Sequence, residues 1–184
     1  MHEKMKKVSP KKLIKIAGKI KLLILDVDGV LTDGSIILDN KNNEFKMFHV
    51  RDGHGIKMLI QSGIQVALIT GRDSHVVLRR AQELGIKEIF QKCHDKTTAY
   101  RQLAKKYALH DSEIAYIGDD IVDIPVLRIC GLPVTIADAD DEVKSFTIMV
   151  TKKEGGKGAV RQVCDLLLKA QGFWEDIING YFQT

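Results

Sequence analysis

The sequence predicts an α/β protein built on a doubly wound, mainly parallel sheet. Short continuous apolar runs alternate along the 184 residues with segments whose apolar residues recur every three or four positions. Such runs are typical of strands buried on both faces, and the segments between them have the period of helices that cover those faces. A glycine or an acidic residue follows most of the runs, at the end of the strands where open sheets bind ligands.

The apolar runs, taken in chain order, predict strands at residues 22–25, 65–69, 88–90, 114–117, 133–136 and 148–150. Helical periodicity predicts helices at 55–61, 74–84, 97–107 and 124–129, and a last helix after residues 155–158 that passes through Val160, Val163, Leu166 and Leu167. Most strands are therefore joined by a helix, as parallel neighbours require.

One interval breaks this alternation. Residues 35–38 and 45–50 both have β-like composition, and the turn-forming residues 39–43 join them. We expect residues 34–50 to form a small β-hairpin flap inserted after the first strand. No shift in composition marks a second domain. Residues 1–184 are therefore expected to form a single domain with no large cap domain, a basic leader at 1–19 and a C-terminal tail and helix at 154–184.

The charge of the chain is concentrated at its start. The net charge is +4, but residues 1–21 hold eight lysines and one acid, so the other 163 residues carry 4 − 7 = −3. A nucleic-acid binder usually spreads basic charge over its fold, so we expect no nucleic-acid partner. The leader is interpreted as solvated, with a nucleic-acid or membrane arm as the alternative.

Cysteine use and hydropathy limit the location of the protein. Cys93, Cys130 and Cys164 show no CxxC spacing, which excludes a disulfide framework and favours a reducing, cytoplasmic compartment. No run approaches the roughly 18 apolar residues needed to span a bilayer, and no signal peptide is visible, so no membrane partner is expected.

Polar residues gather after the central strands, where a parallel sheet places its ligands. These residues are Asp26, Asp28, Thr70, Arg72, Lys96, Asp119, Asp120 and Asp123, and Gly71 lies between Thr70 and Arg72. Several carboxylates in one small volume repel one another unless a cation lies among them. The candidate ligands are all oxygens, which favours Mg²⁺ over Zn²⁺. An EF-hand is excluded because Val30 occupies the fifth position of the loop that Asp26 would begin.

In this order, the residues resemble the four motifs of the haloacid dehalogenase (HAD) superfamily. The match spans about residues 20–137 and rests on Asp26-x-Asp28-Gly-Val, Thr70, Lys96 and Gly-Asp119-Asp. A closer resemblance covers almost the whole chain and points to the 3-deoxy-D-manno-octulosonate (KDO) 8-phosphate phosphatase family. It rests on the segments LLILDVDGVLTDG, FHVRDGHGIK, ITGR, YIGDD and GGKGAVRQVCDLLLKAQG. This family acts in bacterial lipopolysaccharide precursor synthesis and has almost no cap domain.

The resemblance implies a HAD-like Rossmannoid fold and a role for each motif residue. Asp26 matches the nucleophile that forms an aspartyl-phosphate, and Asp28 matches the general acid/base. Thr70 would bind the phosphoryl oxygens and Lys96 would neutralise charge. Mg²⁺ would be held by Asp26, Asp119 and the main-chain carbonyl of Asp28. The remaining acids, Asp120 and Asp123, would orient the metal's waters and Lys96.

The resemblance also implies a sugar phosphate substrate and a homotetramer whose hairpins pack together. Candidate substrate-binding residues are Arg51, Gly71, Arg72, Arg80 and Arg161, because arginine suits an anionic sugar. The flexible segment 155–158 is expected to close over an active site that lacks a cap, and in the family the tail reaches toward a neighbouring subunit. The resemblance thus implies a Mg²⁺-dependent KDO 8-phosphate phosphomonoesterase.

Two alternatives stay open. One is a phosphatase for another acid sugar phosphate, such as a sialic-acid-like 9-phosphate, which would use the same catalytic set. The other is a catalytically idle, phosphatase-like oligomerisation module. The presence of every motif residue argues against an idle module, because such a module has no need of all of them.

Overall fold

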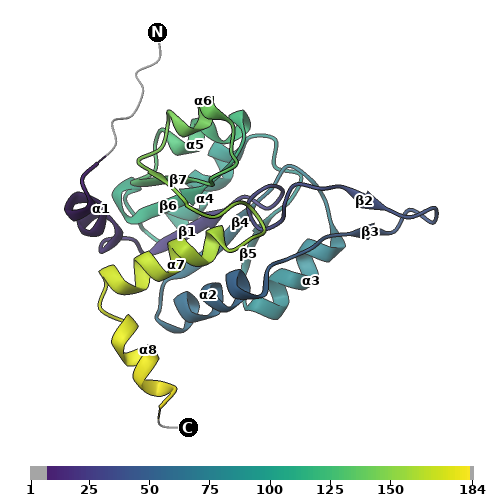
Figure 1. Cartoon of the computed structure of the whole chain (residues 1–184). Coiled ribbons are helices and arrows are strands. Elements are labelled where there is room, and N and C mark those ends of the chain that lie inside the picture. Colours follow the sequence, from purple (N-terminus) through teal and green to yellow (C-terminus); the bar gives the residue numbers. More distant parts are fainter. Residues whose placement is uncertain (1–7, 183–184) are drawn as a thin grey trace.

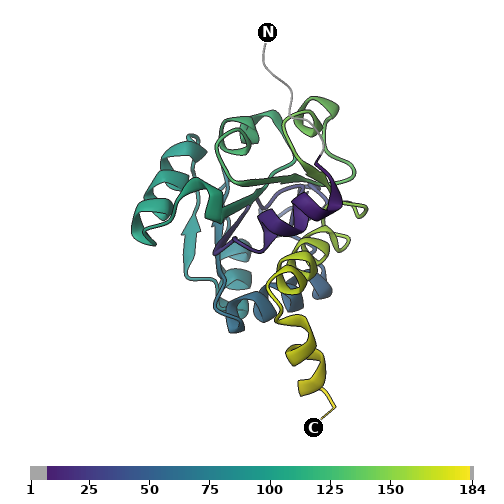
Figure 2. The same ribbon diagram turned by 90° about the vertical axis from the view of Figure 1, so that its left-hand side faces the viewer.

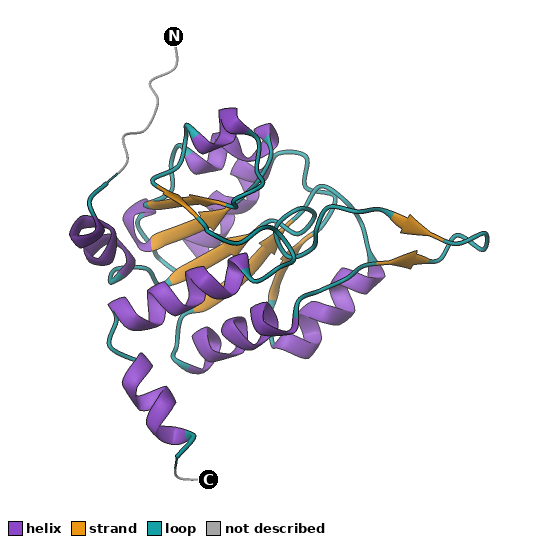
Figure 3. Ribbon diagram, viewed as in Figure 1, coloured by secondary structure: helices purple, strands orange, loops and turns teal. Residues whose placement is uncertain are grey.

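A six-stranded parallel sheet forms the centre of the molecule, in the computed structural model that describes residues 8–182. Its strand order is β5-β4-β1-β6-β7-β8, and every neighbouring pair is parallel. The strands are β1 (Leu22–Leu25), β4 (Gln65–Ile69), β5 (Glu88–Phe90), β6 (Ile114–Ile117), β7 (Leu132–Thr135) and β8 (Met149–Val150). Figures 1 and 3 show helices on both sides of this sheet, so the predicted α/β doubly wound fold is confirmed.

Alternate residues of β1 pack into two hydrophobic cores, one on each face of the sheet. Leu23 and Leu25 point to one face and Leu22 and Ile24 to the other, and all four are fully buried. The first face is covered by α1 (Pro10–Ala17), α2 (Val50–Gln61), α3 (His75–Leu84) and α7 (Ala159–Ala170). The second is covered by α4 (Lys96–Lys106), α5 (Ile124–Leu127) and α6 (Asp141–Lys144). A strand buried on both faces has no polar alternation, which explains the apolar run in the sequence.

The C-terminal helix α8 (Trp174–Gly180) leaves the end of α7 and extends from the body of the molecule (Figure 2). Short 3₁₀ turns occur at Asp111–Glu113 and Ile121–Asp123. Among residues 8–182, no helix combines the length and the apolar character needed to cross a membrane.

The expected solvated leader is wrong in part, because α1 occupies its second half. Ser9 caps this helix by accepting a hydrogen bond from the amide of Lys12 at 3.3 Å, and Pro10 is its first residue. Leu13 and Ile16 pack against the core and Ala17 is buried. The lysines lie on the other faces, so charge alone did not reveal the amphipathic pattern. The rest of the leader prediction, at residues 1–7, lies outside the described residues.

The inserted hairpin pairs β2 (Ile37–Leu38) with β3 (Glu44–Phe45) and projects from the body of the molecule (Figure 1). Its turn is organised by Asp39, whose carboxylate accepts hydrogen bonds from the amides of Lys41 and Asn43, both at 2.8 Å. The second β-like run is shorter than predicted, because Val50 is already the first residue of α2. That helix begins five residues before its predicted start at residue 55.

Candidate active site

The carboxyl ends of β1, β4 and β6 meet at a cleft of about 250 Å³. The residues that line it include Asp26, Asp28, Thr70, Gly71, Arg72, Lys96, Asp119 and Asp120. The sequence placed each of these residues after a strand or at the start of a helix. The parallel sheet brings them together because the ends of its neighbouring strands lie at one edge.

Asp26 and Lys96 form the centre of the cleft. Asp26 directly follows β1, and its amide donates to the carbonyl of Ile117 at 3.0 Å, which extends the sheet pairing by one residue. Lys96 is the first residue of α4, a helix capped by the side chain of Asp95. The Lys96 Nζ lies 3.0 Å from Oδ2 of Asp26, and both side chains are less than 10% exposed.

Asp123 holds Lys96 from the opposite side. Its Oδ1 lies 2.7 Å from Nζ of Lys96 and accepts a hydrogen bond from the Tyr116 hydroxyl at 2.5 Å. Its Oδ2 accepts hydrogen bonds from the amides of Asp119 at 3.0 Å and Asp120 at 3.2 Å. The carboxylate is fully buried and both its oxygens have partners. It is therefore built to position Lys96 and the loop after β6, which agrees with its predicted supporting role.

Asp119 has the free ligand atom that a cation requires. Its Oδ1 is buried and has no hydrogen-bond partner in the described part of the chain. Oxygens of Asp26, Asp119 and Asp123 lie within 4.8 Å of one another. An unpaired buried carboxylate oxygen beside two other acids fits a divalent metal ion, which oxygen ligands of this kind favour. The structure thus supports Asp26 and Asp119 as ligands, while the oxygens of Asp123 already have other partners.

Burial also perturbs the two ligand carboxyls. It raises the pKa of Asp26 to about 7, against the lowering effect of Lys96 and with a further increase from Asp123. It raises the pKa of Asp119 to about 8, and the charges of Asp26 and Asp123 add to this rise. Without a cation, both carboxyls therefore hold their protons to a higher pH than an ordinary aspartate, and a bound cation would favour their ionised forms.

Asp28 faces two residues of the hairpin that the sequence analysis missed. Its carboxylate pairs with Nζ of Lys46, whose side chain is only 1% exposed. Lys46 also lies 3.5 Å from Oε1 of Glu44, and the same oxygen accepts a hydrogen bond from Arg72 at 2.7 Å. Ser74 donates to the other oxygen of Glu44. Although burial raises the pKa of Glu44, the Ser74 hydrogen bond and the charges of Lys46 and Arg72 hold it below its ordinary value.

The pattern in residues 44–48 contains the signal that could have found this pair. Glu44, Lys46 and Phe48 are partly buried, whereas Phe45 and Met47 are exposed. This is the alternation of an extended segment with one face toward the protein. Glu44 and Lys46 face the protein beside Asp28, Phe48 packs against the core, and Phe45 and Met47 face solvent, so the polar side chains of this segment belong to the site.

The predicted substrate-binding residues divide into two groups. Gly71 and Arg72 line the cleft. Arg51 is exposed in the first turn of α2, and the Arg161 side chain pairs with Asp165 at 2.6 Å, so neither lines this chain's cleft.

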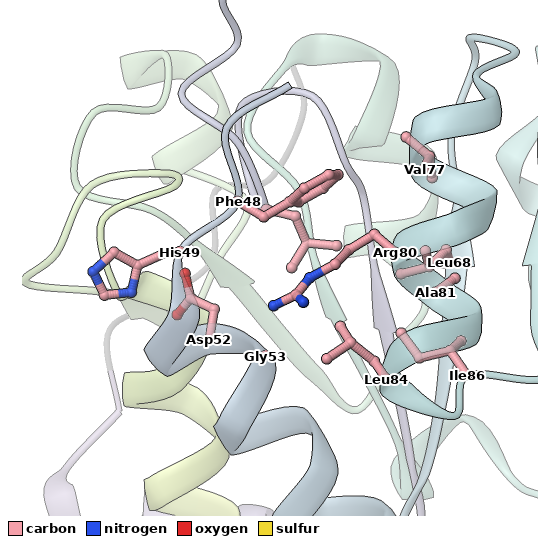
Figure 4. Close-up of a pocket in the computed structure, with 11 residues that line it drawn as sticks. Phe48, His49, Asp52, Gly53, Leu68, Val77, Arg80, Ala81, Leu84 and Ile86 are labelled. Carbon is pink, nitrogen blue, oxygen red and sulfur yellow. The ribbon is translucent and has the colours of Figure 1, made fainter. Parts of the chain in front are cut away.

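Arg80 also lies outside the cleft. Its guanidinium is in a separate small pocket of about 10 Å³ between α2 and α3, shown in Figure 4. There it lies 5.9 Å from the centre of the Phe48 ring and 3.3 Å from Glu83. The sequence does not show in which direction a long side chain on a helix points. It therefore could not separate the arginine that lines the cleft from those that do not.

The segment 155–158 differs from the expected mobile closure. Gly156 donates a backbone hydrogen bond to the carbonyl of Val30 at 3.1 Å, and Gly155 donates to the Asp138 carboxylate at 3.0 Å. The Lys157 ammonium pairs with Glu154 on the surface. The segment is therefore packed behind the loop that follows β1 and does not cover the cleft of its own chain.

The fold and the site define a haloacid dehalogenase-like hydrolase, and the pattern of that family matches residues 82–163. The chain is 47% identical over 159 residues to the 3-deoxy-D-manno-octulosonate 8-phosphate phosphatase KdsC of Yersinia pestis, covering 86% of this chain and 85% of that protein. The chain belongs to the KDO 8-phosphate phosphatase family and is a phosphatase.

Solved structures of relatives have the same fold. A KDO 8-phosphate phosphatase from Moraxella catarrhalis, crystallised with magnesium ion, phosphate ion and KDO, superimposes with a TM-score of 0.92. It is 43% identical, over 94% of this chain and 99% of its own. The cobalt-bound phosphatase from Haemophilus influenzae superimposes with a TM-score of 0.83 and is 46% identical, over 85% and 92% of the two chains. Phosphatases of this family thus bind a divalent metal ion, in agreement with the carboxylate cluster.

Proposed function

We propose that this enzyme is a Mg²⁺-dependent phosphatase that hydrolyses KDO 8-phosphate to KDO and phosphate, within lipopolysaccharide precursor synthesis in the cytoplasm. The observation that carries the proposal is the unpartnered Oδ1 of Asp119 beside Asp26, in a cleft that also contains Asp28, Thr70 and Lys96. This arrangement supports phosphoryl transfer with a divalent cation. The relatives that share it over most of their length act on, or bind, KDO compounds.

The reaction proceeds in two displacements. In the first, a carboxylate oxygen of Asp26 bonds to phosphorus while the bond from phosphorus to the sugar oxygen breaks, and Asp28 gives its proton to the departing alkoxide. In the second, Asp28 takes a proton from water as the water oxygen bonds to phosphorus. The bond to Asp26 then breaks and phosphate leaves.

The other residues of the cleft stabilise charge and geometry. Lys96, held between Asp26 and Asp123, balances the charge of the nucleophile and of the phosphoryl group. Thr70 is 2% exposed at the end of β4, where its hydroxyl would donate to a phosphoryl oxygen. Asp26, Asp119 and the main-chain carbonyl of Asp28 would hold a Mg²⁺ ion, which would supply charge neutralisation between the nucleophile and the phosphoryl group. Asp120, exposed at the rim, would bind the metal's waters.

Arg72 and Lys46 are the cations at the mouth of the cleft on the hairpin side. Both are held by Glu44, and Lys46 also pairs with Asp28. A phosphate or a sugar carboxylate entering the cleft would compete with these carboxylates for the two cations. We therefore assign Arg72, Lys46 and the backbone of Gly71 to substrate binding. Arg51, Arg80 and Arg161 do not line the cleft, so we do not assign them to substrate binding within one chain.

The exposed apolar face of the hairpin supports association between copies of the chain, and the family resemblance makes a homotetramer the expected assembly. Ile36, Leu38, Phe45 and Met47 are each at least half exposed on this small element. A two-stranded hairpin is marginally stable in water, and such side chains are usually covered. Packing of hairpins from several chains would cover them and would close the open side of the cleft.

The test is a panel assay of phosphate release, with and without Mg²⁺. KDO 8-phosphate, a sialic-acid-like 9-phosphate and glucose 6-phosphate are compared, with Asp26→Asn as the inactive control. We expect kcat/KM for KDO 8-phosphate to exceed the others by at least about 10²-fold. Preference for the 9-phosphate would favour the alternative substrate, and turnover by Asp26→Asn would contradict the nucleophile assignment.

A further inference from the structure

Asp52 is a buried carboxylate outside the catalytic cleft. It lies in the first turn of α2, is 1% exposed, and accepts hydrogen bonds from the amides of Gly158 at 3.3 Å and Arg161 at 2.6 Å. Figure 4 shows it beside His49 at the start of α2, next to the light green ribbon of α7. Burying a carboxylate is costly without donors. Here the donors are backbone amides at the start of α7, where the helix dipole also favours a negative charge.

Gly158 is the last residue of the glycine-rich segment 155–158, which rests on the loop after β1, and Arg161 lies in the first turn of α7. Gly156 has a φ of +63°, and a Cβ there would lie 2.6 Å from the carbonyl carbon of Thr32. A Cβ at Gly155 would overlap the carbonyl oxygen of Gly29. The two backbones are therefore in direct contact, with no side chain between them.

Gly29 in turn contacts the metal-binding carboxylate. A Cβ at Gly29 would overlap Oδ2 of Asp119, so only backbone separates Asp119 from the segment 155–158. Asp28, the acid/base, is the residue before Gly29. Close-packed backbone transmits displacement, because it has no side-chain freedom to absorb it. A shift of Gly155 would move Gly29 and change the separation of Asp28 and Asp119.

We propose that Asp52 is a positioning residue for the phosphatase reaction. Through the amides of Gly158 and Arg161 it holds the segment 155–158 against the catalytic loop and so sets the relative positions of Asp28 and Asp119. The inference rests on the phosphatase activity of the chain and does not depend on which sugar phosphate it takes. Misplacement of reacting groups by about 1 Å costs on the order of 10²-fold in rate.

The first test is Asp52→Asn, assayed with p-nitrophenyl phosphate and Mg²⁺ on the full-length enzyme. This substrate reports the chemistry even if the preferred sugar differs from KDO 8-phosphate. We expect kcat to fall about 10- to 100-fold and KM to change less than about 3-fold, because the cleft surface stays intact. The matched control is Asp165→Asn, which removes the carboxylate bound to the Arg161 side chain and leaves the backbone bonds. Its kcat should stay within about 2-fold of wild type.

The second test keeps Asp52 and perturbs the same contact from the other side. Gly156→Ala adds one methyl group against Thr32, whereas Gly172→Ala adds one at φ +80° with no atom within 4 Å. Both variants have backbone strain, but only Gly156→Ala should lower kcat. The double variant Asp52→Asn with Gly156→Ala should lose little more than the worse single variant, since both release one contact.

Three results would overturn the proposal. They are a folded Asp52→Asn enzyme with unchanged kcat, a loss expressed only in KM, and equal losses for Gly156→Ala and Gly172→Ala. If Asp52→Asn does not fold, the comparison of kcat between Gly156→Ala and Gly172→Ala tests the proposal by itself. Circular dichroism checks folding in every case.

Discussion

Metal binding by this enzyme should depend steeply on pH between 6 and 8. The pKa of Asp26 is about 7 and that of Asp119 about 8, both raised chiefly by burial. Protons and the metal ion compete for the same carboxylate oxygens, so raising the pH strengthens metal binding until both groups are ionised. Above pH 8 to 9 the dependence should level off.

The magnitude follows from the two pKa values. At pH 6, Asp26 is ionised in about one molecule in ten and Asp119 in about one in a hundred, whereas at pH 8 the fractions are about nine-tenths and one half. The ionised fractions of the two carboxyls rise by about 9-fold and about 50-fold, and multiplying these increases predicts a rise in apparent Mg²⁺ affinity of about 10²- to 10³-fold. Each Mg²⁺ bound at pH 6 should release about two protons, and each bound at pH 9 about 0.1.

Isothermal titration calorimetry measures both quantities. Titrating Mg²⁺ in two buffers of different ionisation enthalpy yields the number of protons released at each pH. Asp119→Asn should lower the release at pH 6 by about one proton. Asp165→Asn should leave the release unchanged, because Asp165 lies on α7 and its carboxylate pairs with Arg161, away from the metal-binding carboxylates. An affinity that is flat between pH 6 and 8 would refute the reasoning.

Three further predictions concern the acid/base and the hairpin. Asp28→Asn should lower kcat for the sugar phosphate by about 10²- to 10⁴-fold and for an aryl phosphate by less, because the aryl leaving group needs no proton; equal losses in single-turnover assays of the first step would contradict its role. Lys46→Met should raise KM for the sugar phosphate about 10-fold, since a buried charge-assisted contact is lost, whereas Lys41→Met, at the exposed hairpin turn, should leave KM unchanged. Phe45→Glu with Met47→Glu should convert the oligomer to monomers in light scattering, and wild type that is already monomeric at micromolar concentration would refute the proposed packing.

The sequence alone was sufficient to predict the parallel sheet and the edge of that sheet at which the candidate catalytic residues meet. The strand at residues 22–25 is apolar at every position because it is buried on both faces, and this pattern is visible without coordinates. Parallel strands then place Asp26, Thr70 and Asp119 at one edge whatever the details of helix packing. The chemical type of these residues predicted oxygen ligands for a metal ion, and the resemblance of the motifs to the HAD superfamily implied phosphoryl transfer.

Other parts of the site were decided by chain folding and could not be inferred from local patterns. Lys46 reaches Asp28 because the hairpin folds back toward the cleft, a direction that the β-like composition of residues 34–50 does not specify. Arg80 turns into the pocket between α2 and α3, although its residue type suits an anionic substrate equally well. Long side chains on helices can point either way, so tertiary packing sets their partners.

The clearest example of a contact set by tertiary packing is that of Asp52, which in the sequence stands out only as the neighbour of Arg51. Its partners lie 106 and 109 residues further along the chain, where α7 packs beside α2. Sequence therefore determined which residues are chemically able to perform the reaction and at which edge of the sheet they meet. Only the tertiary structure decided which backbone contacts hold them in place, because hydrogen bonds between distant segments exist only after both helices have packed on the sheet.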